Sequence, residues 1–214
     1  MNNTLKILAS VAALAGAASA QASDITFGSA PSSAGAQLSA GDYRSVVNAA
    51  MAQPGAQSAV VSVFDGLSSQ GVFGGGTADH AYRITVSFNA ASAGVWDLRA
   101  GVDFGRGGAI FLDGVALDFK STDMWWDGSY ADPSQSFQLN GLALSAGVHT
   151  LQLYGLDGCC DGGQQAQYRI SGGTFTTFAA NDGLTAAVPE PAGFAIMLAG
   201  LGVVALRAGR RRAI

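Results

Sequence analysis

Two adjacent cysteines, Cys159 and Cys160, are the only thiols in this chain of 214 residues, and they stand in a segment rich in glycine. Gly158 before them, and Gly162 and Gly163 after them, give the backbone access to unusual angles. Free thiols are unstable in an oxidising compartment, so the pattern admits a vicinal disulfide, a bridge to another chain, or two reduced thiols buried under the loop. We predict a vicinal disulfide, and the other two arrangements remain alternatives.

Aromatic side chains stand next to carboxylates in the middle of the chain. Trp125, Trp126 and Tyr130 lie beside Asp123 and Asp127, and aromatic faces next to a few polar groups are suited to hold sugar rings. Packing of the three aromatic side chains in the core or at its rim is the interpretation that we favour, with sugar binding as the alternative. The candidate ligand-binding residues are Asp103, Asp123, Trp125, Trp126, Asp127 and Tyr130.

Aspartates in the second half of the chain raise the question of a metal. Oxygen-rich loops can hold Ca²⁺, but the D-x-D-x-D-G spacing is absent, and aspartate is also an ordinary turn former. We therefore predict no cofactor and no metal site, with Ca²⁺ as the alternative. The aspartates concerned are Asp103, Asp113, Asp118, Asp123, Asp127, Asp132, Asp157 and Asp161.

Few residues are suited to catalysis. The chain has two histidines, His80 and His149, which lie beside or within predicted strands and are interpreted as structural. There is no G-x-S-x-G motif, and the single glutamate, Glu190, is near the C-terminus. We predict a protein that is not an enzyme. The alternatives are a secreted glycan hydrolase that uses two aspartates as acid and base, and a redox module built on the cysteine pair.

Charge and composition narrow the class of protein further. Residues 23–187 carry six basic side chains against 14 aspartates, a net charge of −8. Such a body would repel phosphates, which excludes nucleic acid as a partner. Thirty glycines and 49% apolar residues, with 12% charged, favour many short strands joined by glycine turns.

The N-terminus has the three parts of a secretory signal peptide. Lys6 supplies a positive charge, residues 7–18 form a short apolar core, and small residues allow cleavage after Ala20 or Ala22. The core is too short for a permanent membrane anchor. We predict a signal peptide over residues 1–22, and therefore export.

The C-terminus is organised differently. The motif Val188-Pro189-Glu190-Pro191 is expected to be extended, because each proline fixes its own φ and biases the residue before it away from helix. Residues 192–206 carry no charge and predict a helix of roughly 22 Å, short of the ~30 Å hydrocarbon core, so it would span a thinned bilayer. The arginines expected to stay in the cytoplasm are Arg207, Arg210, Arg211 and Arg212.

These features resemble the PEP-CTERM sorting signal of Gram-negative bacteria that make exopolysaccharide. The resemblance covers residues 188–214 and implies recognition by exosortase, a membrane-embedded enzyme resembling cysteine transpeptidases, with cleavage near the motif. The chain also resembles the CCXG family of PEP-CTERM proteins at Cys159, Cys160 and Gly162, with Asp161 in the variable place. This resemblance implies a shared exported domain without an established activity. The implied partners are exosortase, the membrane and exopolysaccharide. The implied location is the inner membrane, then the cell surface or extracellular matrix.

Hydrophobic periodicity predicts one helix and a series of short strands between the two ends. Ser39 and Asp42 resemble a capping box, apolar residues follow at helical spacing from Tyr43 to Met51, and Pro54-Gly55 would end the helix. Asp113-Gly114 between two apolar runs predicts a hairpin. The predicted strands are Ile25–Phe27, Ala59–Phe64, Ala81–Phe88, Gly94–Val102, Ala109–Leu112, Val115–Phe119, Ser136–Leu139, His149–Tyr154, Gln165–Ser171 and Thr174–Phe178.

The order of elements from Gly94 to Tyr154 resembles PA14-like and carbohydrate-binding jelly rolls. The Asp-Asp pair of calcium-binding PA14 lectins is missing, since Phe104 follows Asp103, so metal and sugar binding are not carried over from the resemblance. We predict an all-β fold, a β-sandwich of jelly-roll type with one short N-terminal helix, over residues 23–180. A linker over 181–187 and the sorting signal over 188–214 would follow. The predicted function is an exported surface or matrix protein whose sandwich binds polysaccharide or other surface proteins.

Overall fold

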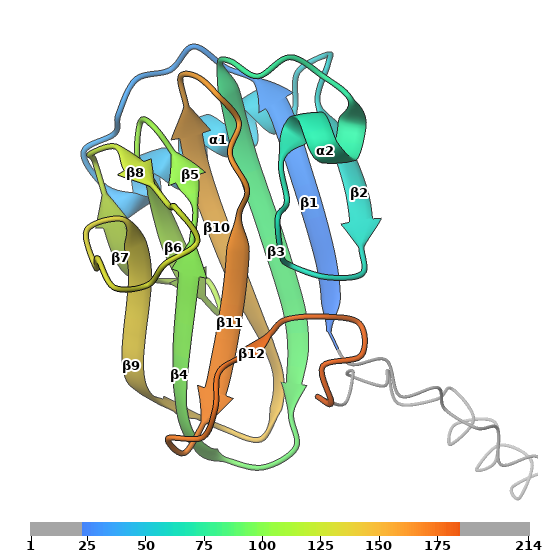
Figure 1. Cartoon of the computed structure of the whole chain (residues 1–214), viewed down its shortest axis with the longest axis vertical. Coiled ribbons are helices and arrows are strands. Elements are labelled where there is room, and N and C mark those ends of the chain that lie inside the picture. Colours follow the sequence, from blue (N-terminus) through green and yellow to red (C-terminus); the bar gives the residue numbers. More distant parts are fainter. Residues whose placement is uncertain (1–22, 185–214) are drawn as a thin grey trace, which may run out of the picture. The chain divides into compact units, whose positions relative to one another are not determined.

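The computed structural model describes residues 23–184 of the chain (Figure 1). The predicted signal peptide, the sorting motif, the C-terminal transmembrane helix and the arginine cluster all lie outside the described residues. Between residues 23 and 184, no helix is both long enough and apolar enough to cross a membrane.

The described chain folds into two antiparallel sheets that pack against each other (Figure 1). The larger sheet has the strand order β2-β1-β3-β10-β6-β7, the smaller one has the order β12-β11-β4-β9, and β5 and β8 form a separate two-stranded ribbon. The predicted β-sandwich with few helices is therefore confirmed. The elements are β1 Asp24–Pro31, α1 Ala40–Met51, β2 Gln57–Val61, α2 Ser69–Phe73, β3 His80–Ala90, β4 Gly94–Gly101, β5 Asp103–Phe104, β6 Gly108–Leu112, β7 Val115–Lys120, β8 Met124–Trp125, β9 Ser136–Leu144, β10 Gly147–Asp157, β11 Gln165–Ile170 and β12 Thr176–Thr177.

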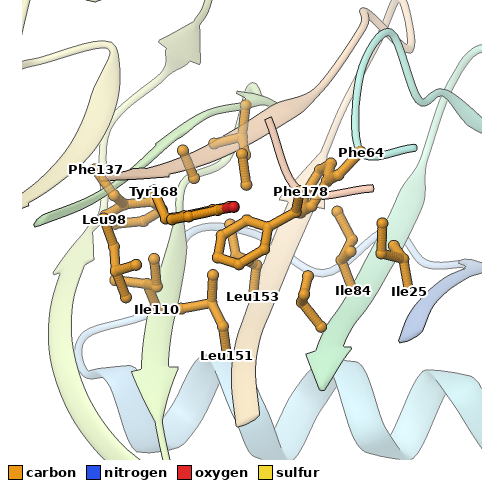
Figure 2. Packing of buried hydrophobic residues seen from close by; sticks show 14 of the residues in the cluster. Ile25, Phe64, Ile84, Leu98, Ile110, Phe137, Leu151, Leu153, Tyr168 and Phe178 are labelled. Atoms are coloured by element: carbon orange, nitrogen blue, oxygen red, sulfur yellow. The ribbon is translucent and has the colours of Figure 1, made fainter. Parts of the chain in front are cut away.

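Alternating apolar residues build the core between the sheets. In β3, the side chains of Tyr82, Ile84, Val86 and Phe88 are buried, whereas the residues between them are half-buried. They belong to one cluster with Leu98 of the smaller sheet, and Figure 2 shows how side chains from both sheets meet there. Each such side chain contributes about 1.5–3 kcal/mol of transfer free energy, so this cluster is what holds the two sheets together.

Helix α1 packs on the opposite face of the larger sheet. Its N-cap is Ser39, whose hydroxyl accepts a hydrogen bond from the backbone N–H of Asp42, as the capping pattern predicts. Tyr43 belongs to a second apolar cluster with Phe111, which points away from the main core. The Tyr43 hydroxyl donates to the carbonyl oxygen of Arg106 at 2.7 Å. The helix therefore fixes the loop that follows β5.

The Asp113-Gly114 hairpin joins β6 to β7 as predicted, with positive φ at both residues. Asp113 also engages His149 of β10, whose Nδ1 lies 2.7 Å from the Asp113 carboxylate and whose Nε2 lies 3.0 Å from the carbonyl oxygen of Ser145. Burial of the ring lowers its pKa, but the two hydrogen bonds and the charge of Asp113 outweigh burial and raise the pKa of His149. The ring nitrogens thus both face acceptors, which favours the imidazolium.

This pair predicts a pH-dependent stability. A raised pKa means that the stabilisation is fully present below the ordinary histidine pKa of about 6.5 and is lost as the pH rises through the folded-state value. We expect the free energy of unfolding to fall above about pH 6.5 by up to about 1 kcal/mol, since Asp113 is partly exposed. Thermal melts from pH 5 to pH 9 measure it. Asp113→Asn should flatten the dependence, and an equally steep profile in this variant would contradict the assignment.

Three short elements were not predicted from the sequence. Helix α2 and the two strands of the β5–β8 ribbon have no periodic pattern, because each is five residues long or shorter. Strand β9 continues to Leu144 past the predicted end at Leu139, with a register shift opposite β4. Strand β12 is shorter than predicted.

The described body continues past residue 180. The carboxylate of Asp182 accepts hydrogen bonds from the Ser23 hydroxyl at 2.7 Å and from the backbone N–H of Leu184 at 3.0 Å. The Tyr168 hydroxyl donates to the Asp182 carbonyl oxygen. Residues 181–184, at the start of the predicted linker, thus tie the first residues of the body to its last.

Candidate functional site

An open cavity of about 370 Å³ lies between the β5–β8 ribbon and the loop that follows β10. We call it the disulfide pocket. It brings together three of the predicted ligand-binding residues and both cysteines. The residues that line it are Asp103, Gly105, Arg106, Asp123, Trp125, Asp157, Gly158, Cys159 and Cys160.

The β5–β8 ribbon places one carboxylate and one aromatic ring on this pocket. Asp103 and Trp125 are paired across the ribbon, as are Phe104 and Met124. Phe104 and Met124 are fully buried and anchor the ribbon in the main core. Successive residues of a strand point to opposite faces, so Trp125 is directed outward, and 66% of its surface is exposed.

The loop after β10 carries a vicinal disulfide between Cys159 and Cys160. Both cysteines are exposed, and both line the pocket. Cys160 has φ +87° and Asp161 has φ +46°. Two consecutive residues other than glycine in the left-handed region are unusual. The loop therefore takes a backbone path that needs external support.

Asp157 supplies part of that support from the end of β10. Its side chain is fully buried and accepts hydrogen bonds from the backbone N–H groups of Gly105, Cys159 and Asp161 at 3.2–3.3 Å. Burial raises the pKa of Asp157, and the backbone hydrogen bonds oppose that rise. This carboxylate thus organises both walls of the pocket.

Asp161 connects the same loop to α2. Its carboxylate accepts from the backbone N–H groups of Ser69 at 2.7 Å and Gln70 at 2.5 Å, which lie in the first turn of the helix. It also accepts from the Tyr82 hydroxyl, and burial together with this carboxylate raises the pKa of Tyr82. An aspartate 91 to 92 residues away in the chain therefore caps α2.

Asp103 closes the pocket on the ribbon side. One of its carboxylate oxygens accepts from the backbone N–H of Gly162 at 2.6 Å. Burial raises its pKa to about 6, despite that hydrogen bond, and the charges of Asp157 and Asp123 act in the same direction as burial. Burial is the main cause of this rise.

Arg106 is the basic residue of the lining, but its charge is used elsewhere. Its Nη2 lies 2.6 Å from a carboxylate oxygen of Asp79, and its Nη1 donates to the carbonyl oxygen of Ala34 at 3.2 Å. Asp103, Asp123 and Asp157 therefore bring three carboxylates to the lining, against one guanidinium that is already paired with Asp79. The disulfide pocket is therefore electronegative.

The remaining predicted residues lie away from this pocket. The ring of Trp126 packs over Gly101, where a Cβ atom would come within 2.2 Å of the indole. Tyr130 stacks with the guanidinium of Arg99, whose Cζ is 3.9 Å from the ring centroid. Asp127 accepts from the backbone N–H of Ser129 in a turn. Trp126 and Tyr130 instead pack against each other, with ring centroids 5.5 Å apart, and neither they nor Asp127 form one platform with Trp125.

Sequence reasoning did not single out Arg106, and it named Asp157 and Asp161 only as possible Ca²⁺ ligands and, for Asp161, as the variable place of the CCXG motif. An aspartate before glycine and another after the cysteines read locally as turn formers. The only indication in the sequence that Asp157 and Asp161 belong to the site is their position on both sides of the Cys159–Cys160 pair. Between residues 23 and 184, no group of three or more histidine, cysteine, aspartate or glutamate side chains is placed to hold a metal ion.

Comparison with known proteins gives a likeness in fold. No family model matches the chain, and no curated protein matches it. Among solved structures, the chain is similar to a PA14 sugar-binding domain from an RTX adhesin, with 11% identity and a TM-score of 0.54 over 79% of this chain and 100% of that one. It is also similar to the PA14 domain of the antifreeze protein MpAFP, with 11% identity and a TM-score of 0.50 over 78% of this chain and 91% of that one.

Proposed function

We propose that the chain is an exported surface or matrix protein of the jelly-roll type that binds polysaccharide through the disulfide pocket and does not hydrolyse it. The observation that carries this proposal is the exposed Trp125 ring on a cavity lined by carboxylates. An aromatic face contacts the C–H groups of a sugar ring, and the exposed carboxylate of Asp123 can accept hydrogen bonds from its hydroxyl groups. The likeness to a PA14 domain described as sugar-binding supports the same assignment.

The charge of the pocket indicates a class of polysaccharide. Asp103, Asp123 and Asp157 give it a negative potential, because Arg106 is paired with Asp79. A polymer of uronic acids would be repelled. Neutral hexoses, which offer only hydroxyl groups, fit acceptor-lined walls best.

Binding to immobilised polysaccharides tests this assignment. We expect the exported protein to bind at least one of three neutral polymers, dextran, laminarin and galactomannan, and to bind alginate and polygalacturonate at least tenfold more weakly at low salt. The panel is run with EDTA and with added Ca²⁺. Equal binding to the neutral and uronic polymers would contradict the role given to the carboxylates. Binding that appears only with Ca²⁺ would replace direct carboxylate contacts by a metal.

Two observations favour binding over hydrolysis. The Asp157 carboxylate accepts from three backbone N–H groups, and Asp103 accepts from Gly162. Both carboxylates thus have structural partners, whereas a hydrolase needs one free acid and one free base or nucleophile. The raised pKa values of Asp103 and Asp157 favour the hydrolase alternative. Release of reducing ends from the polymers that bind distinguishes the two, and turnover that Asp103→Asn abolishes would establish the hydrolase.

The proposed route to the surface rests on residues 1–22 and 188–214. A signal peptide exports the body, the C-terminal helix holds it at the inner membrane, and exosortase cleaves near Val188-Pro189-Glu190-Pro191. We expect the mature protein from cells with exosortase to lack Arg210, Arg211 and Arg212 by intact mass. The doubly substituted Pro189→Ala, Pro191→Ala variant should keep them. A wild-type mass that retains the arginines would overturn this route, while leaving the pocket unaffected.

A further inference from the structure

The disulfide loop joins the pocket to the rest of the fold within four consecutive residues. The N–H of Cys159 donates to Asp157, and the N–H of Cys160 donates to the carbonyl oxygen of Thr77 at 2.6 Å. Asp161 caps α2, and the N–H of Gly162 donates to Asp103. Any change in the backbone path of this loop would therefore break contacts with the pocket wall and with α2 at the same time.

The disulfide is the covalent constraint on that path. Cys160 and Asp161 both have φ in the left-handed region, which residues with a Cβ adopt rarely unless the surroundings impose it. The ring closed by the two sulfurs includes the peptide between the cysteines and limits the angles open to it. Without the bond, Cys160 would be free to return to negative φ.

The bond is also accessible. Both cysteines are exposed and line an open cavity, so a small thiol can reach the Cys159–Cys160 pair from the solvent. The attacking species is a thiolate in either case, so the negative charge of the same cavity disfavours most a reductant that carries further anionic groups and least a reductant that carries none.

We propose that the Cys159–Cys160 bond is a redox switch that controls ligand binding at the disulfide pocket, opened by a neutral dithiol. The inference rests on the proposed function, because it names the regulation of that same site. One thiolate of the dithiol attacks a cysteine sulfur, the S–S bond breaks, and the released cysteine thiolate takes up a proton. The second thiol then displaces the other cysteine, so the dithiol is oxidised to its disulfide and two cysteine thiols are formed.

The consequences of reduction follow from the contacts. Once Cys160 leaves the left-handed region, its N–H loses the hydrogen bond to the carbonyl oxygen of Thr77. The Asp161 carboxylate then moves away from the first turn of α2, and the Gly162 N–H moves away from Asp103. The N–H groups of Ser69 and Gln70 in the first turn of α2 would then lack their acceptor, and Asp103 would lack its backbone donor. The pocket loses a wall while the main core, built from other residues, stays intact.

Two readouts on the exported full chain test the switch. The protein is treated with dithiothreitol, and alkylation counted by mass establishes that two thiols have formed. We expect hydrogen exchange at the amides of Ser69, Gln70 and Gly162 to accelerate at least tenfold, and affinity for the neutral polymers to fall at least tenfold. Reoxidation should restore both. The Cys159→Ser, Cys160→Ser variant should resemble the reduced protein and ignore dithiothreitol.

The outcomes separate this inference from the proposed function. Unchanged exchange and unchanged affinity after reduction would overturn the switch and leave polysaccharide binding in place. If no polymer binds to the oxidised or the reduced protein, the proposed function fails, and control of ligand binding fails with it. Faster amide hydrogen exchange after reduction would still establish that the disulfide holds the loop. Reduction by anionic glutathione should be slower than reduction by dithiothreitol, and the difference should shrink at high salt. Equal rates of reduction by the two thiols at low salt, after correction for their thiol pKa values, would contradict the role given to the negative charge of the pocket.

Discussion

Replacing Trp125 by alanine is expected to weaken binding of the neutral polysaccharides by roughly 10- to 100-fold. Aromatic side chains at the centre of a binding site typically account for about 2 kcal/mol or more when truncated, which is at least tenfold in affinity. Stability should change little, because 66% of the Trp125 surface is exposed. Affinity is measured by titration with the polymer that binds tightest in the wild type.

Phe119 provides the matched control for this substitution. It is an aromatic side chain on β7 with 41% of its surface exposed, and it does not line the disulfide pocket. Phe119→Ala should bind as the wild type does. Equal losses in the two variants would place binding outside the pocket, and an unchanged affinity in Trp125→Ala would remove the main support for the proposed site.

Replacing Gly162 by alanine is expected to lower the free energy of unfolding by about 1–3 kcal/mol, the usual cost of overpacking. A Cβ atom at this position would lie 2.2 Å from the carboxylate oxygen of Asp103 that accepts the Gly162 N–H. The clash and the hydrogen bond involve the same oxygen atom, so moving Asp103 away to relieve the clash would break the hydrogen bond. Thermal unfolding measures the effect, which should amount to a fall in Tm of roughly 2–10 °C.

A second glycine shows whether the effect is local. Gly35 has free space around its Cβ position and does not line the pocket, so Gly35→Ala should leave both stability and binding near the wild-type values. Gly162→Ala should also lose affinity, since Asp103 forms part of the pocket wall. If the two variants melt alike, the tight approach between the disulfide loop and Asp103 does not exist in solution.

The sandwich could be predicted because its main determinants are local. The alternation of Tyr82, Ile84, Val86 and Phe88, and the positive-φ pair Asp113-Gly114, specify β3 and the β6–β7 hairpin without reference to the rest of the chain. Ser39 likewise marks the start of α1 from its own neighbours.

Helix α2 could not be predicted, because part of its cap comes from far away. Its segment is five residues long and contains a glycine, and isolated helices of that length are unstable. The acceptor for Ser69 and Gln70 is Asp161, which only the folded disulfide loop brings to that position. Local sequence carries no trace of this contact.

The candidate site could be predicted only in part for the same reason. Trp125 and Trp126 are neighbours in sequence, which suggests one platform, yet the pairing of β8 with β5 directs Trp125 to the pocket and leaves Trp126 over Gly101. Asp103 and Cys159 share a cavity only because β5 and the end of β10 meet there. Residue types pointed to the chemistry, and long-range pairing decided which of them come together.

The most direct measurement of the central claim is a map of amide and indole NMR shifts during titration with a neutral oligosaccharide of the polymer that binds tightest. Binding at the disulfide pocket predicts that the Trp125 indole N–H and the amides of Asp103, Cys159 and Cys160 shift together and saturate, while the Trp126 indole does not move. Shifts centred on Trp126, Arg99 and Tyr130, with none at Trp125 or the cysteines, would contradict it.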